Sequence, residues 1–153
     1  MIENNKMKIE IKAALDNVAI VRVAISTFIS TLNITIDELM DIKTAISEAV
    51  TNAIEHAYTD DVIDDSSVIV NGYIYSNDED IIKVEIEDKG IGIDDIETAM
   101  MPTYTSKPEL EHAGMGFTIM ETFMDEILID SVKNQGTKIT LIKKIKKKKS
   151  KVI

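Results

Sequence analysis

Apolar residues recur along this chain with two periods, one typical of helices and one typical of strands. Spacings of three and four residues predict a helix over residues 18–32, a longer one over 35–58 and a short one over 117–124. Alternation of apolar and polar residues predicts strands at 8–12, 67–75, 81–88, 126–131 and 137–142. This order predicts an α+β fold, a two-layer α/β sandwich with helices on one face of a mixed, mostly antiparallel sheet.

Local motifs set some of the element boundaries. Thr35 and Glu38 have the spacing of a capping box, which predicts the start of the second helix. Asp16 or Asn17 is suited to cap the first helix. Asn134 and Gly136 are suited to the turn between the last two strands.

The length of 153 residues favours a single domain, which we expect to span 1–142. Residues 143–153 form a lysine-rich segment, which we expect to be a flexible tail. The absence of cysteine excludes disulfides, thiol catalysis and cysteine-ligated zinc. The chain has no apolar segment long enough to span a bilayer and no signal-peptide core at its start, so we expect a cytoplasmic protein.

The net charge of −10 is unevenly distributed. The last eleven residues hold seven of the 17 basic residues, so the rest of the chain carries 10 basic and 27 acidic residues, a net charge of −17. Such a surface repels nucleic acid and favours a basic protein partner.

Three short motifs bear on ligand binding, and each also has an ordinary structural explanation. Asp88 precedes Gly90 and Gly92 at the end of a strand, where a carboxylate can accept a hydrogen bond from an exocyclic amine such as that of adenine, or can simply close a turn. Gly114 and Gly116 precede a helix, where free backbone N–H groups favour a phosphate, or where the glycines only shape the helix entry.

Glu48 and Asn52 form the third motif, four residues apart on the polar face of the second helix. A carboxylate there can deprotonate a nucleophile, and a carboxamide oxygen can coordinate Mg²⁺. Both residue types also occur commonly on solvent-exposed helix faces. The chain has no Walker A sequence and no HRD or DFG kinase motif.

A fourth element, Gly136-Thr137, precedes the last strand. The order Glu48-Ala-Val-Thr-Asn52, Asp88-x-Gly90-x-Gly92, Gly114-x-Gly116 and Gly136-Thr137 resembles that of the GHKL ATPases, the superfamily of gyrase B, Hsp90, histidine kinases and MutL. Within that superfamily the chain resembles the sporulation-type anti-sigma F factors of bacilli and clostridia. The resemblance covers residues 9–141 and is densest at 21–29, 42–54 and 106–126.

The resemblance implies a Bergerat ATP-binding fold and a role for each matching residue. Glu48 would be the catalytic base and Asn52 the Mg²⁺ ligand in the ATP site. The remaining ATP-binding residues would be Asp88 at the adenine amine, Gly90 and Gly92 around the adenine, Gly114 and Gly116 at the phosphates, and Thr137 on the adenine side. Thr105 and Lys107, in the implied ATP lid, would contact phosphate or lie solvated.

Two positions bear on activity and partners. The family tends to carry Arg-Ser before Gly-x-Gly where this chain has His112-Ala113, so a cationic phosphate contact is missing or depends on pH. Arg22, the only arginine, would contact the sigma factor and the anti-anti-sigma factor, or would be a surface cation.

The resemblance implies a homodimer that binds and inhibits sigma factor F and uses ATP-Mg²⁺ to phosphorylate a serine of the anti-anti-sigma factor, its protein substrate. Neither direct nucleic-acid binding nor membrane binding is expected. The alternative is a nucleotide-gated binding module of the stress-response anti-sigma type with little kinase activity. A detached histidine-kinase domain would need a histidine-bearing dimerisation helix, which this chain does not encode.

Overall fold

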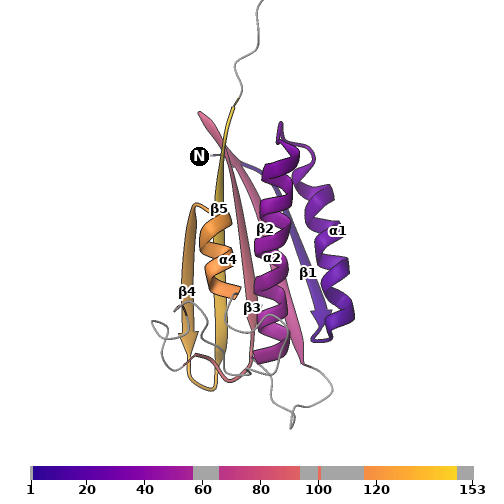
Figure 1. The fold of residues 1–153 in the computed structure, drawn as a ribbon, viewed down its shortest axis with the longest axis vertical. Coiled ribbons are helices and arrows are strands. Elements are labelled where there is room, and N and C mark those ends of the chain that lie inside the picture. The colour runs from indigo at the N-terminus through magenta and orange to yellow at the C-terminus, as the bar shows by residue number, and fades with distance from the viewer. Residues whose placement is uncertain (1, 57–65, 94–99, 101–115, 148–153) are drawn as a thin grey trace, which may run out of the picture.

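In the computed structural model, which describes residues 2–56, 66–93, 100 and 116–147, the chain forms two layers. Within these residues, the α-helices cover one face of a five-stranded sheet (Figure 1). The elements in chain order are β1 (Ile2–Lys12), a 3₁₀ turn (Leu15–Asn17), α1 (Val18–Ile29), α2 (Ile36–His56), β2 (Ser67–Ser76), β3 (Glu79–Asp88), α4 (Gly116–Phe123), β4 (Glu126–Val132) and β5 (Gly136–Lys146). The predicted α+β sandwich, with its helices on one face, is confirmed.

The sheet has the order β1-β2-β3-β5-β4, and all four pairings are antiparallel. β5 lies between β3 and β4, so the last strand of the described chain is an interior strand. Its register places Thr137 opposite Asp88 of β3 and opposite Ser131 of β4. Residues from three separate stretches of sequence therefore meet where β5 begins.

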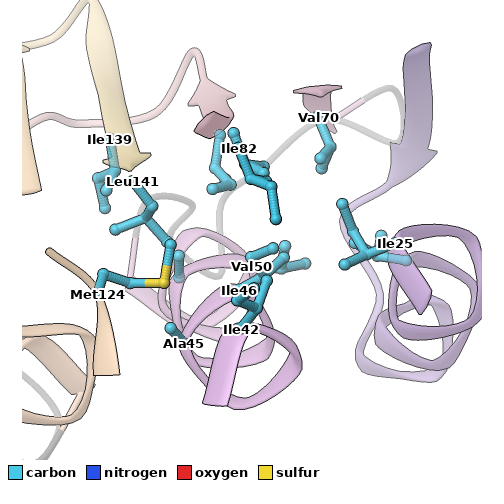
Figure 2. Packing of buried hydrophobic residues seen from close by; sticks show 14 of the residues in the cluster. Ile25, Ile42, Ala45, Ile46, Val50, Val70, Ile82, Met124, Ile139 and Leu141 are labelled. Carbon is cyan, nitrogen blue, oxygen red and sulfur yellow. The ribbon is translucent and has the colours of Figure 1, made fainter. Parts of the chain in front are cut away.

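The core lies between α2 and the centre of the sheet. Ile42, Ile46 and Val50 of α2 are completely buried, as the helical spacing predicts. Figure 2 shows these side chains facing Ile82 and Leu141 of the sheet. Burying each such side chain stabilises the fold by about 1.5–3 kcal/mol. α2 is therefore held firmly against the sheet along most of its length.

The capping box is confirmed, but the start of the first helix differs from the prediction. Glu38 N–H donates to Thr35 Oγ1 at 3.1 Å, and Thr35 N–H donates to Glu38 Oε1 at 3.0 Å. Asn17 makes no side-chain capping bond, because its Nδ2 donates to the carbonyl of Lys12 at 3.0 Å instead. A 3₁₀ turn leads directly into α1, in the place where a side-chain cap was expected.

Two strands extend beyond their predicted ends. β1 begins at Ile2, because residues without alternation still pair with β2 across an irregularity between Glu3 and Asn5. β5 runs to Lys146, so its first lysines past residue 142 pair with β3. Lys143 and Lys144 thus belong to the sheet rather than to the expected tail, and residues 148–153 lie outside the described residues.

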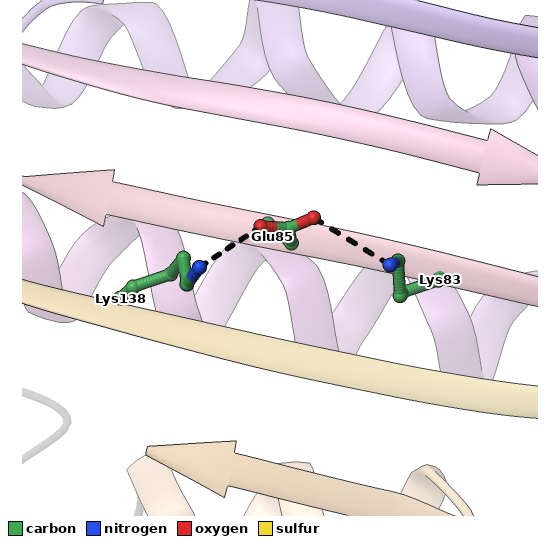
Figure 3. A network of polar contacts seen from close by, with 3 residues as sticks. All are labelled: Lys83, Glu85 and Lys138. Carbon is green, nitrogen blue, oxygen red and sulfur yellow. Dashed lines mark ion pairs between the residues drawn. The ribbon is translucent and has the colours of Figure 1, made fainter. Parts of the chain in front are cut away.

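The face of the sheet away from the helices carries a charged cluster. Glu85 of β3 lies between two lysines, 3.7 Å from Lys83 and 3.5 Å from Lys138 (Figure 3). Lys83 also lies over the ring of Tyr73, 4.8 Å from its centroid. Partly exposed ion pairs of this kind each contribute about 0–1 kcal/mol, so they shape this face more than they stabilise it. No helix within the described ranges is long and apolar enough to cross a membrane.

Candidate functional site

The predicted site residues converge at one end of the sandwich. α2 and β3 finish at this end, while α4 and β5 begin there (Figure 1). Asn52 lies in the last turn and a half of α2, Asp88 is the last residue of β3, Gly116 opens α4 and Thr137 is the second residue of β5. Segments separated by up to 85 positions in sequence thus contribute to one region.

Asn52 and Gly116 are in direct contact. A Cβ at position 116 would lie 3.0 Å from Oδ1 of Asn52 and closer still to its amide nitrogen, so a larger residue fits there only if the Asn52 side chain moves. The contact sets the amino end of α4 against the side chain that we expect to hold Mg²⁺. The first N–H groups of a helix have no partner within the helix, and they carry the positive end of its dipole. This end of α4 is therefore suited to an anion.

Glu48 lies one turn before Asn52 on the same face of α2. Both residues are half-buried, and the Oε2 atom of Glu48 is buried. Neither side chain is fully solvated, and α4 packs against α2 at Asn52. A carboxylate shielded from water is a stronger hydrogen-bond acceptor than one in bulk solvent, which suits a general base.

Asp88 is a half-buried carboxylate at the end of β3. Its Oδ1 accepts a hydrogen bond from Gly90 N–H at 2.9 Å, so the turn-closing alternative is realised. Burial raises the pKa of Asp88, and hydrogen bonds from the N–H groups of Gly90 and Thr137 oppose this rise. These bonds orient the carboxyl group and do not exclude the adenine role, since a carboxylate accepts several hydrogen bonds.

Two glycines at this end are required by the backbone. Gly136 has a φ of 116°, and a Cβ there would collide with the carbonyl oxygen of Asp88. Gly92 has a φ of 78°, and a Cβ there would lie 2.5 Å from the carbonyl oxygen of Val132. Each glycine thus lets the segment after β3 approach the turn between β4 and β5. Asn134, with a φ of 63°, occupies that turn as predicted.

Ser131 is central to this region, although it belongs to none of the motifs found in the sequence. Its Oγ accepts a hydrogen bond from Ile93 N–H at 2.7 Å and lies 2.8 Å from Thr137 Oγ1. The alternation of β4 turns Ser131 to the same face as Ile127 and Ile129. A polar residue at an inward-facing strand position is the sequence feature that could have identified it.

The structure describes only some of the remaining predicted site residues. Gly90 contributes its N–H to Asp88, and it has no positive φ. Thr105, Lys107 and Gly114 lie outside the described residues, as does His112. The roles assigned to them stay predictions.

A cavity of about 290 Å³ also opens at this end, but on the other face of the sheet. Its lining includes Ile69, Glu87 and Lys138, which alternate with the core residues of their strands and so face away from the helices. Asp88 and Thr137 also contribute to its lining, whereas Glu48 and Asn52 do not.

Arg22 lies on the exposed face of α1. Ile20 and Val23, beside it, are 53% and 67% exposed although both are apolar. Among the residues that the structure describes, no carboxylate lies within ion-pair distance of its guanidinium. An arginine flanked by exposed apolar side chains has the composition typical of protein interfaces.

The sequence matches the family model of the histidine kinase-like ATPase domain over residues 11–143. It is 53% identical over 142 residues to an anti-sigma F factor of Clostridium perfringens, covering 93% of this chain and 98% of that protein. The chain belongs to the anti-sigma F factor family. Anti-sigma F factors of Clostridium beijerinckii and Geobacillus kaustophilus are 50% and 44% identical, covering 94% and 95% of this chain and 96% and 97% of theirs.

Solved structures agree on the fold of this anti-sigma F family member. The RsbU and RsbW domains of Rv1364c from Mycobacterium tuberculosis superpose with a TM-score of 0.68 at 20% identity, covering 98% of this chain and 35% of that one. A blue-light activated histidine kinase from Erythrobacter litoralis EL346 gives a TM-score of 0.50 at 18% identity, covering 88% of this chain and 61% of that one. The predicted GHKL fold is thus confirmed.

Proposed function

We propose that this protein inhibits sigma factor F and, with ATP and Mg²⁺, phosphorylates a serine of an anti-anti-sigma factor. The observation that carries the proposal is the contact between Asn52 and Gly116, which brings the end of α2 to the amino end of α4. With Asp88 and Thr137 at the same end of the sandwich, this arrangement offers groups for the phosphates and the base of one nucleotide.

The side chains at this end of α2 are suited to binding Mg²⁺. Asn52 offers an amide oxygen one turn from the partly buried carboxylate of Glu48, and oxygen is the ligand that Mg²⁺ prefers. The described residues contain no group of three or more acidic or histidine side chains able to enclose an ion. Mg²⁺ commonly binds with one or two protein ligands, and nucleotide phosphates and water complete its shell. When bound, it neutralises charge on the phosphates.

The chemical step assigned to the chain is removal of one proton. Glu48 takes the proton from the serine hydroxyl of the substrate as that oxygen bonds to the γ-phosphorus of ATP. The bond between this phosphorus and the oxygen bridging to the β-phosphate breaks, and ADP leaves. The N–H groups at the start of α4 favour the negative charge of the phosphates. Positioning and charge neutralisation supply most of the catalysis in such a transfer.

The partner surface that we propose is centred on Arg22. Its exposed guanidinium and the neighbouring Ile20 and Val23 would contact sigma factor F and the anti-anti-sigma factor. We also propose that the protein acts as a homodimer in the cytoplasm without binding nucleic acid or membrane directly, in keeping with its acidic body.

A phosphorylation assay on Glu48 tests the enzymatic part. Glu48→Gln keeps the shape of the side chain and removes the base. We expect it to lower the rate of phosphate transfer to the anti-anti-sigma factor by at least about a hundredfold, the size of a general-base contribution. ATP and sigma factor binding should change little.

Asp41→Asn is the matched control, because Asp41 lies two turns earlier on the same polar face of α2. It should phosphorylate at the wild-type rate. Unchanged transfer by Glu48→Gln would reject the role of Glu48. Absence of transfer in the wild-type protein, with sigma binding retained, would favour the nucleotide-gated binding module.

A further inference from the structure

Ser131 joins three segments at the end of the sandwich where the nucleotide is proposed to bind. It lies on β4 directly opposite Thr137 of β5. Its hydroxyl accepts from Ile93 N–H at 2.7 Å, lies 2.8 Å from Thr137 Oγ1 and donates to the carbonyl of Gly136 at 3.3 Å. One hydroxyl of β4 thus links the segment after β3 to the first two residues of β5.

The segment after β3 depends on these links for its position. Gly90, Ile91 and Gly92 form no regular element, and only two hydrogen bonds tie this stretch and Ile93 to the turn between β4 and β5 within the described ranges. One is Asn134 N–H to the carbonyl of Ile91 at 2.7 Å. The other is the bond to Ser131. Of the two, only the Ser131 bond uses a side chain, so it is the one that a substitution can remove.

The same hydroxyl restrains Thr137. A threonine at the start of a strand can rotate its hydroxyl, and a partner at 2.8 Å on the neighbouring strand limits that rotation. Thr137 lies opposite Asp88, and its backbone N–H donates to the Asp88 carboxylate. Asp88 and Thr137, the two residues proposed to contact the nucleotide base, are therefore adjacent. Ser131 is hydrogen-bonded to Thr137, whose hydroxyl could otherwise rotate.

We propose that Ser131 is a positioning residue for the nucleotide base, acting through Thr137 and the Gly90–Ile93 segment rather than by touching the ligand. This inference rests on the proposed function, since it requires a nucleotide at Asp88 and Thr137. It gives strand β4 a role in base recognition, although β4 lies outside all four sequence motifs.

The test compares three substitutions at one position. Ser131→Ala removes the hydroxyl, Ser131→Cys keeps similar volume with a weak hydrogen-bonding group, and Ser131→Thr keeps the hydroxyl. Calorimetric titration with ATP should show about five- to tenfold weaker binding for the first two, the effect of one hydrogen bond. Ser131→Thr should stay within about twofold of wild type.

Ser76→Ala is the matched control. Ser76 is the last residue of β2 and, like Ser131, hydrogen-bonds a side chain, donating to Asp80 Oδ1 at 2.7 Å, but it lies at the opposite end of β2 from the site. Its ATP affinity should equal that of wild type. The melting temperature of each variant without nucleotide shows whether weaker binding merely follows lost stability.

A double substitution tests the route through Thr137. In a Thr137→Val background, Ser131→Ala should weaken ATP binding much less than it does alone, because the group that it restrains is gone. Equal losses in both backgrounds would overturn the part of the inference that runs through Thr137. Wild-type affinity in Ser131→Ala or Ser131→Cys would overturn the whole inference while leaving the proposed function standing. A wild-type protein that binds no ATP would overturn both.

Discussion

Gly116 and Asn52 lie so close that the α-carbon of one fills the space beside the amide of the other. The contact joins the first residue of α4 to the last turns of α2, two elements separated by 59 residues of sequence. Any side chain at this position would have to displace the amide of Asn52, although Gly116 has no positive φ. The constraint therefore comes from a neighbouring side chain rather than from the backbone conformation.

Gly116→Ala should therefore destabilise the protein, because the added methyl group overlaps the amide of Asn52. We expect a loss of about 1–3 kcal/mol in the free energy of unfolding, measured by urea denaturation. Asn52→Ala in the same chain makes room for the methyl group. The double variant should regain most of the lost stability while still binding ATP poorly. A double variant as unstable as Gly116→Ala alone would contradict this account of the contact.

Asp88 should make stability depend on pH in a definite direction. Burial raises its pKa above the ordinary 3.8, so the folded protein binds this proton more tightly than the unfolded chain does. Its stabilising contribution is complete below pH 3.8 and is lost as the pH rises through the raised pKa. Relative to Asp88→Asn, the wild-type protein should become less stable over that interval.

Urea denaturation of both proteins at a series of pH values measures this difference. Glu87→Gln is the control, because Glu87 is the preceding residue of β3 and faces away from Asp88 across the sheet. A difference between wild type and Asp88→Asn that is constant with pH, or that grows in favour of wild type as pH rises, would contradict the prediction.

Arg22→Ala should weaken binding of sigma factor F at least about tenfold, as expected for an arginine at the centre of an interface. Arg22→Lys should not restore it, because an ammonium group cannot form the paired hydrogen bonds of a guanidinium. Stability should change by less than about 0.5 kcal/mol, since the side chain is exposed.

Lys8→Ala removes the same charge from the opposite, outer face of β1 and serves as the control for Arg22. Surface plasmon resonance with immobilised sigma factor measures both variants. Equal binding by Arg22→Ala and Lys8→Ala would place the partner surface elsewhere.

The sequence predicted the elements because their apolar spacing reflects burial on one face. The stripe on α2 that includes Ile42, Ile46 and Val50 is buried as expected. Predicted ends were less accurate where pairing with a neighbouring strand overrides local pattern. Residues near Ile2 and Lys143 lack the expected alternation yet pair with β2 and β3, because a partner strand supplies hydrogen bonds whatever the side chains are.

The layers, the capping box at Thr35 and the order of the motifs follow from the sequence, because each depends on spacing within a short stretch. The contact of Asn52 with Gly116, the partial burial of Glu48 and the pairing of Ser131 with Thr137 arise only when the elements pack together. Helical periodicity assigns Glu48 and Asn52 to a polar face, but whether that face meets water depends on where α4 packs. Such contacts join distant segments, and their existence depends on the folding of the whole chain.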